Sequence, residues 1–124
     1  MQRNMDLVRT ILMGIESRPP GRASLDFGIS YSAEEIGYHL YIMMQEGLIE
    51  GHNVTTGESR SPVIIPSSIT WKGHEFLDVA RDQERWNQAK SIIARVGSAP
   101  IAVWTKVLSD LLLKSVEKAV PQAG

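Results

Sequence analysis

The sequence contains no cysteine among its 124 residues. A chain without thiols cannot form a disulfide scaffold, use a thiolate nucleophile, or hold zinc or an iron–sulfur cluster through cysteine. It also lacks any apolar run near the roughly 18 residues that a membrane-spanning helix needs, and its N-terminus lacks the apolar segment of a secretory signal peptide. We therefore expect a cytoplasmic protein that makes no contact with a membrane.

A surplus of positive charge is missing as well, because 13 basic residues face 14 acidic ones and the formal net charge is −1. Such a chain has no global field that attracts nucleic acid or an anionic membrane. The sequence also lacks a G-x-S-x-G elbow, a phosphate-binding glycine loop and an H-E-x-x-H helix. It therefore predicts neither an enzyme nor a bound cofactor.

What the sequence does contain is an ordinary globular composition, with 43% hydrophobic and 22% charged residues in a length that suits about one domain. Apolar residues at helical spacing predict a first helix over about residues 5–17, and alternating residues predict a short strand over 25–29. Ser32-Ala33-Glu34-Glu35 is a capping box. It predicts a helix over about 32–46, which ends before Gly47.

The middle of the chain predicts a β-hairpin. Residues 48–50 can pair either with 63–65 or with 68–70, across a polar stretch over 52–62 that is rich in Asn, Thr, Gly and Ser. The sequence leaves the choice between these two registers open.

Three further helices are expected after the hairpin. Thr70 caps the first, over residues 71–80, and Asp82 begins the second, which ends at Val96-Gly97. Pro100 begins the last helix at its first turn, where a missing amide costs nothing. The fold class is therefore α+β. The expected parts are a core over 1–96, a C-terminal helix over 97–120 that packs on the core or forms a dimer, and an unstructured tail over 121–124.

Two phrases carry a resemblance to a known fold. They are Glu46-Gly47-Leu48-Ile49-Glu50 before the hairpin and Ile69-Thr70-Trp71-Lys72-Gly73 after it. They resemble the winged helix-turn-helix superfamily, in which the first phrase closes the recognition helix, the hairpin is the wing, and the second phrase opens the next helix. The resemblance implies a winged helix-like core (helix, short strand, helix, β-hairpin wing, helix) with additional C-terminal helices.

Within that superfamily, four segments look like a family of short bacterial and phage proteins of unknown function. The segments are 5–9, 31–40, 47–51 and 70–78, and the resemblance covers about residues 1–95. That family has no established activity, so any function taken from it is an analogy.

The winged-helix resemblance implies contacts with DNA, for which Arg18, Arg22, Arg60 and Lys72 are the candidates. Arg60 lies at the tip of the expected wing, which often contacts the phosphate backbone or the minor groove. The alternative is that Arg60 is a solvated loop residue. Residues 25–52, which include the candidate recognition helix, hold five acids and no Lys or Arg, so this face should repel a duplex.

The same helix has features of a protein interface. Tyr38 and Tyr41 are three residues apart and share a face, and Glu34 and Glu35 precede them on the helix. Exposed tyrosines on an acidic helix suit a protein partner. The alternative is that one of them packs on the hairpin or on the last helix.

The last helix is apolar over more than one stripe. We expect its surface at Trp104, Leu108, Leu111 and Leu112 to be buried against another copy of the chain, which makes a homodimer. The alternative is that it packs back on the rest of the chain. All three tryptophans are expected to be core or interface anchors: Trp71, Trp86 and Trp104.

One pair of residues has the spacing of metal ligands. His74 and Asp78 lie four residues apart on one helical face. A zinc site needs three or four ligands, and the chain offers no second histidine at a matching spacing. We therefore expect no metal.

Two functions from different classes follow. The first is a small winged-helix, DNA-associated transcriptional regulator, which we rank first because most bacterial winged helices bind DNA. The alternative is a phage- or prophage-encoded protein–protein interaction module with no DNA binding. It would bind a host factor or inhibit a defence system, or act as an acidic nucleic-acid mimic. The order of elements favours the first function, and the chemistry of the helix over 32–46 favours the second.

Overall fold

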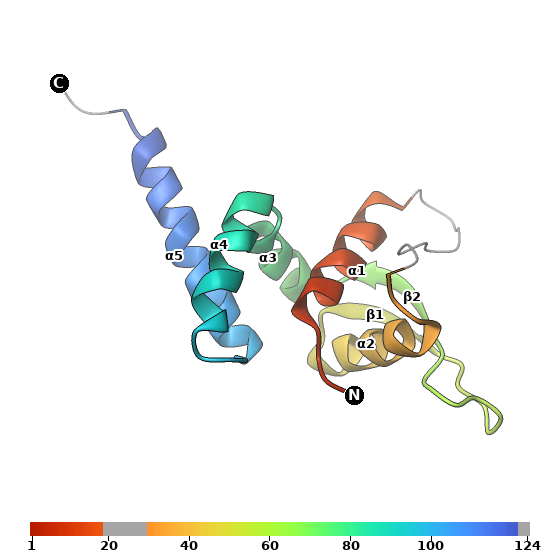
Figure 1. Cartoon of the computed structure of the whole chain (residues 1–124). Coiled ribbons are helices and arrows are strands. Elements are labelled where there is room, and N and C mark those ends of the chain that lie inside the picture. Colours follow the sequence, from red (N-terminus) through yellow and green to blue (C-terminus); the bar gives the residue numbers. More distant parts are fainter. Residues whose placement is uncertain (19–29, 122–124) are drawn as a thin grey trace. The chain divides into compact units, whose positions relative to one another are not determined.

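The computed structural model describes residues 1–18 and 30–121. The expected strand over 25–29 and the candidate Arg22 lie outside these residues, as does all but the first residue of the expected tail. The described residues form helices and one two-stranded antiparallel sheet, which confirms the α+β class (Figure 1). The elements are α1 (Met5–Ser17), α2 (Ala33–Glu46), β1 (Ile49–Asn53), β2 (Ile64–Ile69), α3 (Trp71–Ala80), α4 (Gln83–Ala94) and α5 (Ile101–Ala119).

The chain divides into two compact units, Met1–Leu77 and Asp78–Gly124. The first unit holds α1, α2 and the hairpin, the second holds α4 and α5, and α3 begins in the first and ends in the second. This division falls earlier than the boundary at residue 96 that the sequence predicts, since α4 packs against α5.

Local hydrogen bonds determine where the first two helices begin and end. The side chain of Asn4 accepts from the amides of Asp6 and Leu7, at 3.0 and 3.3 Å, and so caps α1. The predicted capping box of α2 is present: the Ser32 hydroxyl accepts from the Glu35 amide at 3.1 Å, and the Glu35 carboxylate accepts from the Ser32 amide at 3.2 Å. Gly47 ends α2 in the left-handed conformation, with φ +84°, as the sequence predicts.

The hairpin adopts the second of the two registers that the sequence allows. Ile49 pairs with Ile69 and Glu50 with Ser68, whereas the residues that follow in β1 pair with 64–66. A β-bulge between Glu50 and Gly51 separates these two sets of pairs. The strands are therefore longer than the three-residue segments that the sequence predicts, and they extend further toward the loop. The Val54 amide closes the loop by donating to the Val63 carbonyl at 2.9 Å.

Helices α1 and α2 pack on each other and on the hairpin, as Figure 1 shows. The apolar stripe of α1 supplies much of the buried core, including Leu7, Ile11 and Leu12. Near the start of α2, Gly37 permits a close approach, because a Cβ there would lie 2.2 Å from the carbonyl oxygen of Pro62.

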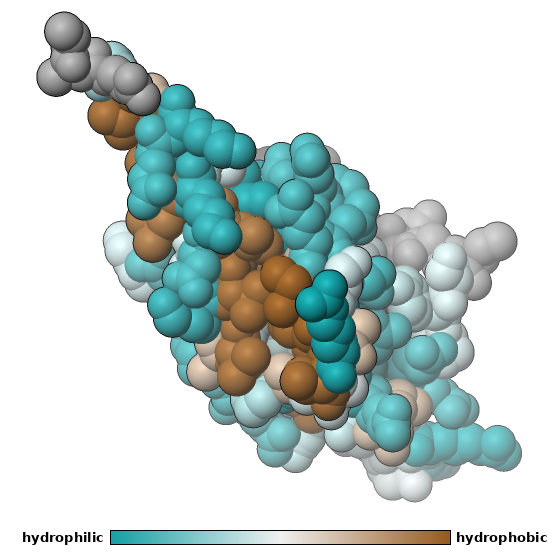
Figure 2. All heavy atoms as spheres, turned by 60° about the vertical axis from the view of Figure 1, so that its left-hand side comes forward, coloured by the Kyte–Doolittle hydropathy of each residue, from teal (hydrophilic) through white to brown (hydrophobic). Residues whose placement is uncertain are grey.

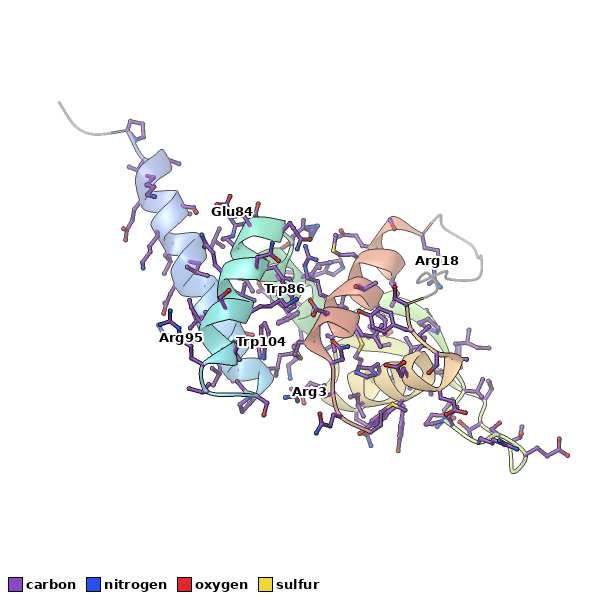
Figure 3. All side chains as sticks on the ribbon, in the orientation of Figure 1. Arg3, Arg18, Glu84, Trp86, Arg95 and Trp104 are labelled. Atoms are coloured by element: carbon purple, nitrogen blue, oxygen red, sulfur yellow. The ribbon has the colours of Figure 1, made fainter. Side chains whose placement is uncertain are left out.

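The second unit is built around two stacked tryptophans. Trp86 of α4 and Trp104 of α5 have ring centroids 4.8 Å apart and planes inclined by 26° (Figure 3). Asp82 caps α4 as predicted, because its carboxylate accepts from the Arg85 amide at 2.9 Å. Pro100 occupies the cap position immediately before α5 rather than the first turn of the helix.

Candidate functional site

The first unit carries a surface where the end of α2 meets the start of α3. Gly73 allows this approach, because a Cβ on it would lie 2.1 Å from the carbonyl oxygen of Leu48. Thr70 ties the two segments together, since its hydroxyl donates to the Gly47 carbonyl and accepts from the Gly73 amide. We call the resulting patch the Trp71 surface and define it by four residues: Glu46, Trp71, Lys72 and Glu75.

Trp71 is 82% exposed, the highest value among the large hydrophobic residues that the structure describes. Its indole Nε1 donates to Glu75 Oε1 at 3.0 Å. The Lys72 ammonium lies 2.6 Å from Glu46 Oε1 and 3.1 Å from the Glu46 carbonyl oxygen. These bonds hold the side chains around the indole in place, which lowers the entropy cost of binding a partner there.

The tyrosines of α2 are half-buried rather than fully exposed. The Tyr38 ring meets the His39 ring edge-on, with centroids 5.7 Å apart. Tyr41 accepts through its hydroxyl from Gln45 Nε2 at 3.2 Å. Tyr41 is therefore tied to its neighbour along α2, whereas Tyr38 has part of its ring committed to packing.

The charge on α2 is entirely acidic. No Lys or Arg occurs in its 14 residues, whereas Glu34, Glu35 and Glu46 all lie on it. Glu34 is exposed, Glu35 is engaged in the capping box, and Glu46 pairs with Lys72 at the other end of the helix. This helix offers no group that neutralises a phosphate.

Two of the four residues proposed to contact DNA have partners within the chain. Arg18, at the end of α1, donates through Nη1 to the Pro66 carbonyl at 3.0 Å and through Nη2 to the Ser67 carbonyl at 2.8 Å (Figure 3). Lys72 belongs to the Trp71 surface and pairs with a carboxylate there. Arg60 is exposed in the loop between the strands.

The residues of α5 that were expected at a dimer interface do not share one environment. Trp104 and Leu108 are buried, at 8% and 0% exposure, so they cannot present a surface to a second copy. Leu111 and Leu112 are half-buried. The exposed apolar residues of the helix include Leu113 and Val116, because the stacking of Trp104 determines which face of α5 turns inward.

The exposure of Trp71 was not predicted, although the sequence contains a signal for it. With about 100° of rotation per residue, Trp71 lies roughly opposite the mean direction of Phe76, Leu77 and Ala80 on a helical wheel. Those three residues are buried. If Trp71 is grouped with the other apolar residues of the helix, its position on the exposed face is overlooked.

The described residues show no arrangement for metal chemistry. No three His, Asp or Glu side chains in residues 1–18 and 30–121 come together as ligands. His74 is exposed, with Asp78 four residues away. In the same residues, no helix has the length and apolar character needed to cross a membrane.

The fold and this surface define a small α+β protein with a helix-flanked hairpin and an exposed aromatic patch. The chain belongs to the family described as "Hypothetical protein (DUF2513)", whose model matches residues 2–99. It is also similar to an uncharacterized protein of Haemophilus influenzae, with 37% identity over 95 residues that cover 75% of this chain and 79% of that protein. No solved structure matches the chain.

Proposed function

We propose that this protein is an interaction module that binds a partner protein through the Trp71 surface. The observation that carries the proposal is the exposed indole of Trp71, which is 82% accessible although it is the largest apolar side chain type. Tryptophan is enriched among the residues that dominate binding energy at protein interfaces, where truncation of one such residue costs about 2–4 kcal/mol.

The charges around the indole define the partner. Glu75 bonds the indole and Glu46 pairs with Lys72, so this surface has one more acid than base, and the rest of α2 contributes further acids and no Lys or Arg. The complementary surface is therefore an apolar pocket that receives the indole, with Lys or Arg residues on its rim. A basic rim would also accelerate association at low salt.

The competing proposal is the DNA-associated regulator. It needs cations that meet phosphates. Among the candidates within residues 1–18 and 30–121, Arg18 and Lys72 have partners within the chain, which leaves Arg60; the candidate Arg22 lies outside these residues. We rank it below the interaction module because, within the described residues, one loop arginine neutralises about one phosphate.

A homodimer through α5 is also a proposal. It would use Leu113 and Val116, which are 56% and 47% exposed, rather than Trp104 and Leu108. Sedimentation equilibrium of the wild-type protein and a Leu113→Ser, Val116→Ser variant tests it, because a dimer held by these residues would dissociate in the variant.

The experiment that tests the main proposal compares the wild-type protein with Trp71→Ala in affinity capture from a lysate of the source cells. Ile65→Ser is the matched control, because Ile65 is also an exposed apolar residue, on the hairpin at 54% exposure. We expect Trp71→Ala to lose one captured protein that Ile65→Ser retains, and the purified pair to show a weaker Kd by about 30-fold or more with Trp71→Ala.

Fluorescence anisotropy with a labelled random duplex at about 50 and 200 mM salt tests the competing proposal. Binding that weakens steeply with salt, survives Trp71→Ala and is lost in Arg60→Ala would favour the DNA-associated regulator. In the capture experiment, equal recovery of the partner by the wild-type protein, Trp71→Ala and Ile65→Ser would show that Trp71 is not part of the interface.

A further inference from the structure

The second unit contains a groove between α4 and α5. Its volume is about 730 Å³, which is the size of pockets that hold small molecules. Ile92 and Leu111 provide apolar walls, and Gln88, Ser91 and Ser115 provide hydrogen-bonding groups. The remaining lining residues are charged: Asp82, Glu84, Arg85, Lys114 and Lys118.

The three cations of the groove have no ion-pair partner among the residues that the structure describes. Other cations of the same unit are paired: Arg81 lies 3.1 Å from Asp78, and Lys106 lies 2.9 Å from Asp110. The positive side chains of the groove are therefore not neutralised by ion pairs among the described residues.

Arg85 gives the second observation. Its Nε is fully buried and finds no hydrogen-bond partner within the described part of the chain. A buried donor without a partner costs about 1–3 kcal/mol, and such groups in native proteins call for an explanation. Arg85 lines the groove, and its Nε makes no hydrogen bond within the described part of the chain.

The acids of the groove do not cancel its positive charge. Asp82 is already engaged as the cap of α4, where its carboxylate accepts from the backbone. That leaves Glu84 against three cations. The unit as a whole has the same sign, because residues 78–124 contain seven basic and five acidic residues.

We propose that this groove binds a small organic anion, with an apolar body against Ile92 and Leu111 and an acid group held by Arg85, Lys114 and Lys118. Guanidinium and ammonium groups both bind phosphate and carboxylate through charge-assisted hydrogen bonds. Figure 2 shows hydrophilic and hydrophobic residues next to one another along α5. The groove lies in the second unit, so the proposal goes beyond the binding of a partner at Trp71.

The test is a ¹⁵N–¹H NMR titration of the full chain with phenyl phosphate, benzoate, inorganic phosphate and benzyl alcohol. We expect saturable shifts for phenyl phosphate or benzoate, confined to amides near residues 82–92 and 111–118, and weaker binding of inorganic phosphate and benzyl alcohol. The first two probes distinguish a phosphate ligand from a carboxylate ligand. Comparison with the last two shows that both the acid and the apolar body contribute.

A Lys114→Gln, Lys118→Gln variant should weaken the binding of the better probe by about tenfold or more. Arg95→Gln is the control. Arg95 is exposed at the opposite end of α4 from Glu84, and its replacement removes one positive charge outside the groove (Figure 3). Three results would overturn the proposal: no saturable shift at millimolar probe, shifts outside the groove, or an equal loss of affinity in Arg95→Gln.

Discussion

Replacement of His39 by alanine is the sharpest test of how the first unit is held together. His39 is 1% exposed, and both of its ring nitrogens are engaged. Nε2 accepts from the Asn4 amide at 2.8 Å, which places the ring proton on Nδ1, 2.8 Å from the Glu35 carbonyl oxygen. One side chain on α2 therefore satisfies the backbone of the residue that caps α1.

The magnitude follows from what the variant leaves behind. Loss of the imidazole leaves the part-buried Asn4 amide without its acceptor, which costs about 1–2 kcal/mol. The space left by the ring adds a cavity term of roughly 2 kcal/mol. We expect His39→Ala to lower the free energy of unfolding by about 3–4 kcal/mol. His39→Gln should lose less, because its amide oxygen can still accept from Asn4.

Urea denaturation followed by far-UV circular dichroism measures this effect. With a slope of about 1.5 kcal/mol per molar urea, the midpoint of His39→Ala should fall by roughly 2 M. His52→Ala is the control, because His52 is exposed on the hairpin and should change the midpoint very little. If His39→Ala and His52→Ala had the same midpoint, the bridge between α1 and α2 would contribute nothing.

Three further substitutions test separate contacts. Gly37→Ala would ordinarily stabilise a helix by about 1 kcal/mol, but its Cβ would clash with the Pro62 carbonyl, so we expect a net loss of about 2 kcal/mol in urea denaturation, and a gain would contradict the close approach. Arg18→Met should lower the free energy of unfolding by about 1–3 kcal/mol in the same assay, whereas an unchanged value would mean that its two carbonyl bonds are not formed in solution. Trp104→Ala should cost about 3–5 kcal/mol and Trp71→Ala about 0.5 kcal/mol or less, and equal losses would contradict the burial of one and the exposure of the other.

The ends of the helices could be predicted because their signals act over three or four residues. Ser32 and Glu35 satisfy each other's backbone amides, and Gly47 takes the left-handed conformation that other residues avoid. Such contacts need no knowledge of the rest of the fold. The register of the hairpin could not be predicted from local signals, since both candidate partner segments of Ile49, 63–65 and 68–70, contain apolar residues. The bulge after Glu50 lets β1 pair with 68–69 at its start and with 64–66 further on, and the apolar pattern alone does not reveal this.

The same difference explains why the tryptophans and leucines were harder to place. Trp71 and Trp104 both occur in helical patterns rich in apolar residues, yet one is exposed and the other is stacked on Trp86. Composition does not separate them, because burial depends on which face of each helix meets a neighbour. For α5 that face is determined by the tryptophan stack. As a result Leu108, which was predicted at an interface, is buried, and Leu113 is exposed.

The role of the basic residues shows why the order of the two functional hypotheses changes. From the sequence, Arg18 is a candidate for a phosphate contact near the end of the first helix. In the structure, its guanidinium bonds two carbonyls of β2, at Pro66 and Ser67, next to the bulge that interrupts the pairing with β1. A guanidinium whose donors bond neutral carbonyls keeps its positive charge but has fewer donors left for a phosphate, and the exposed Lys72 has a carboxylate beside it in Glu46. These bonds hold the first unit together, and the exposed aromatic residue next to Lys72 is the stronger guide to a partner.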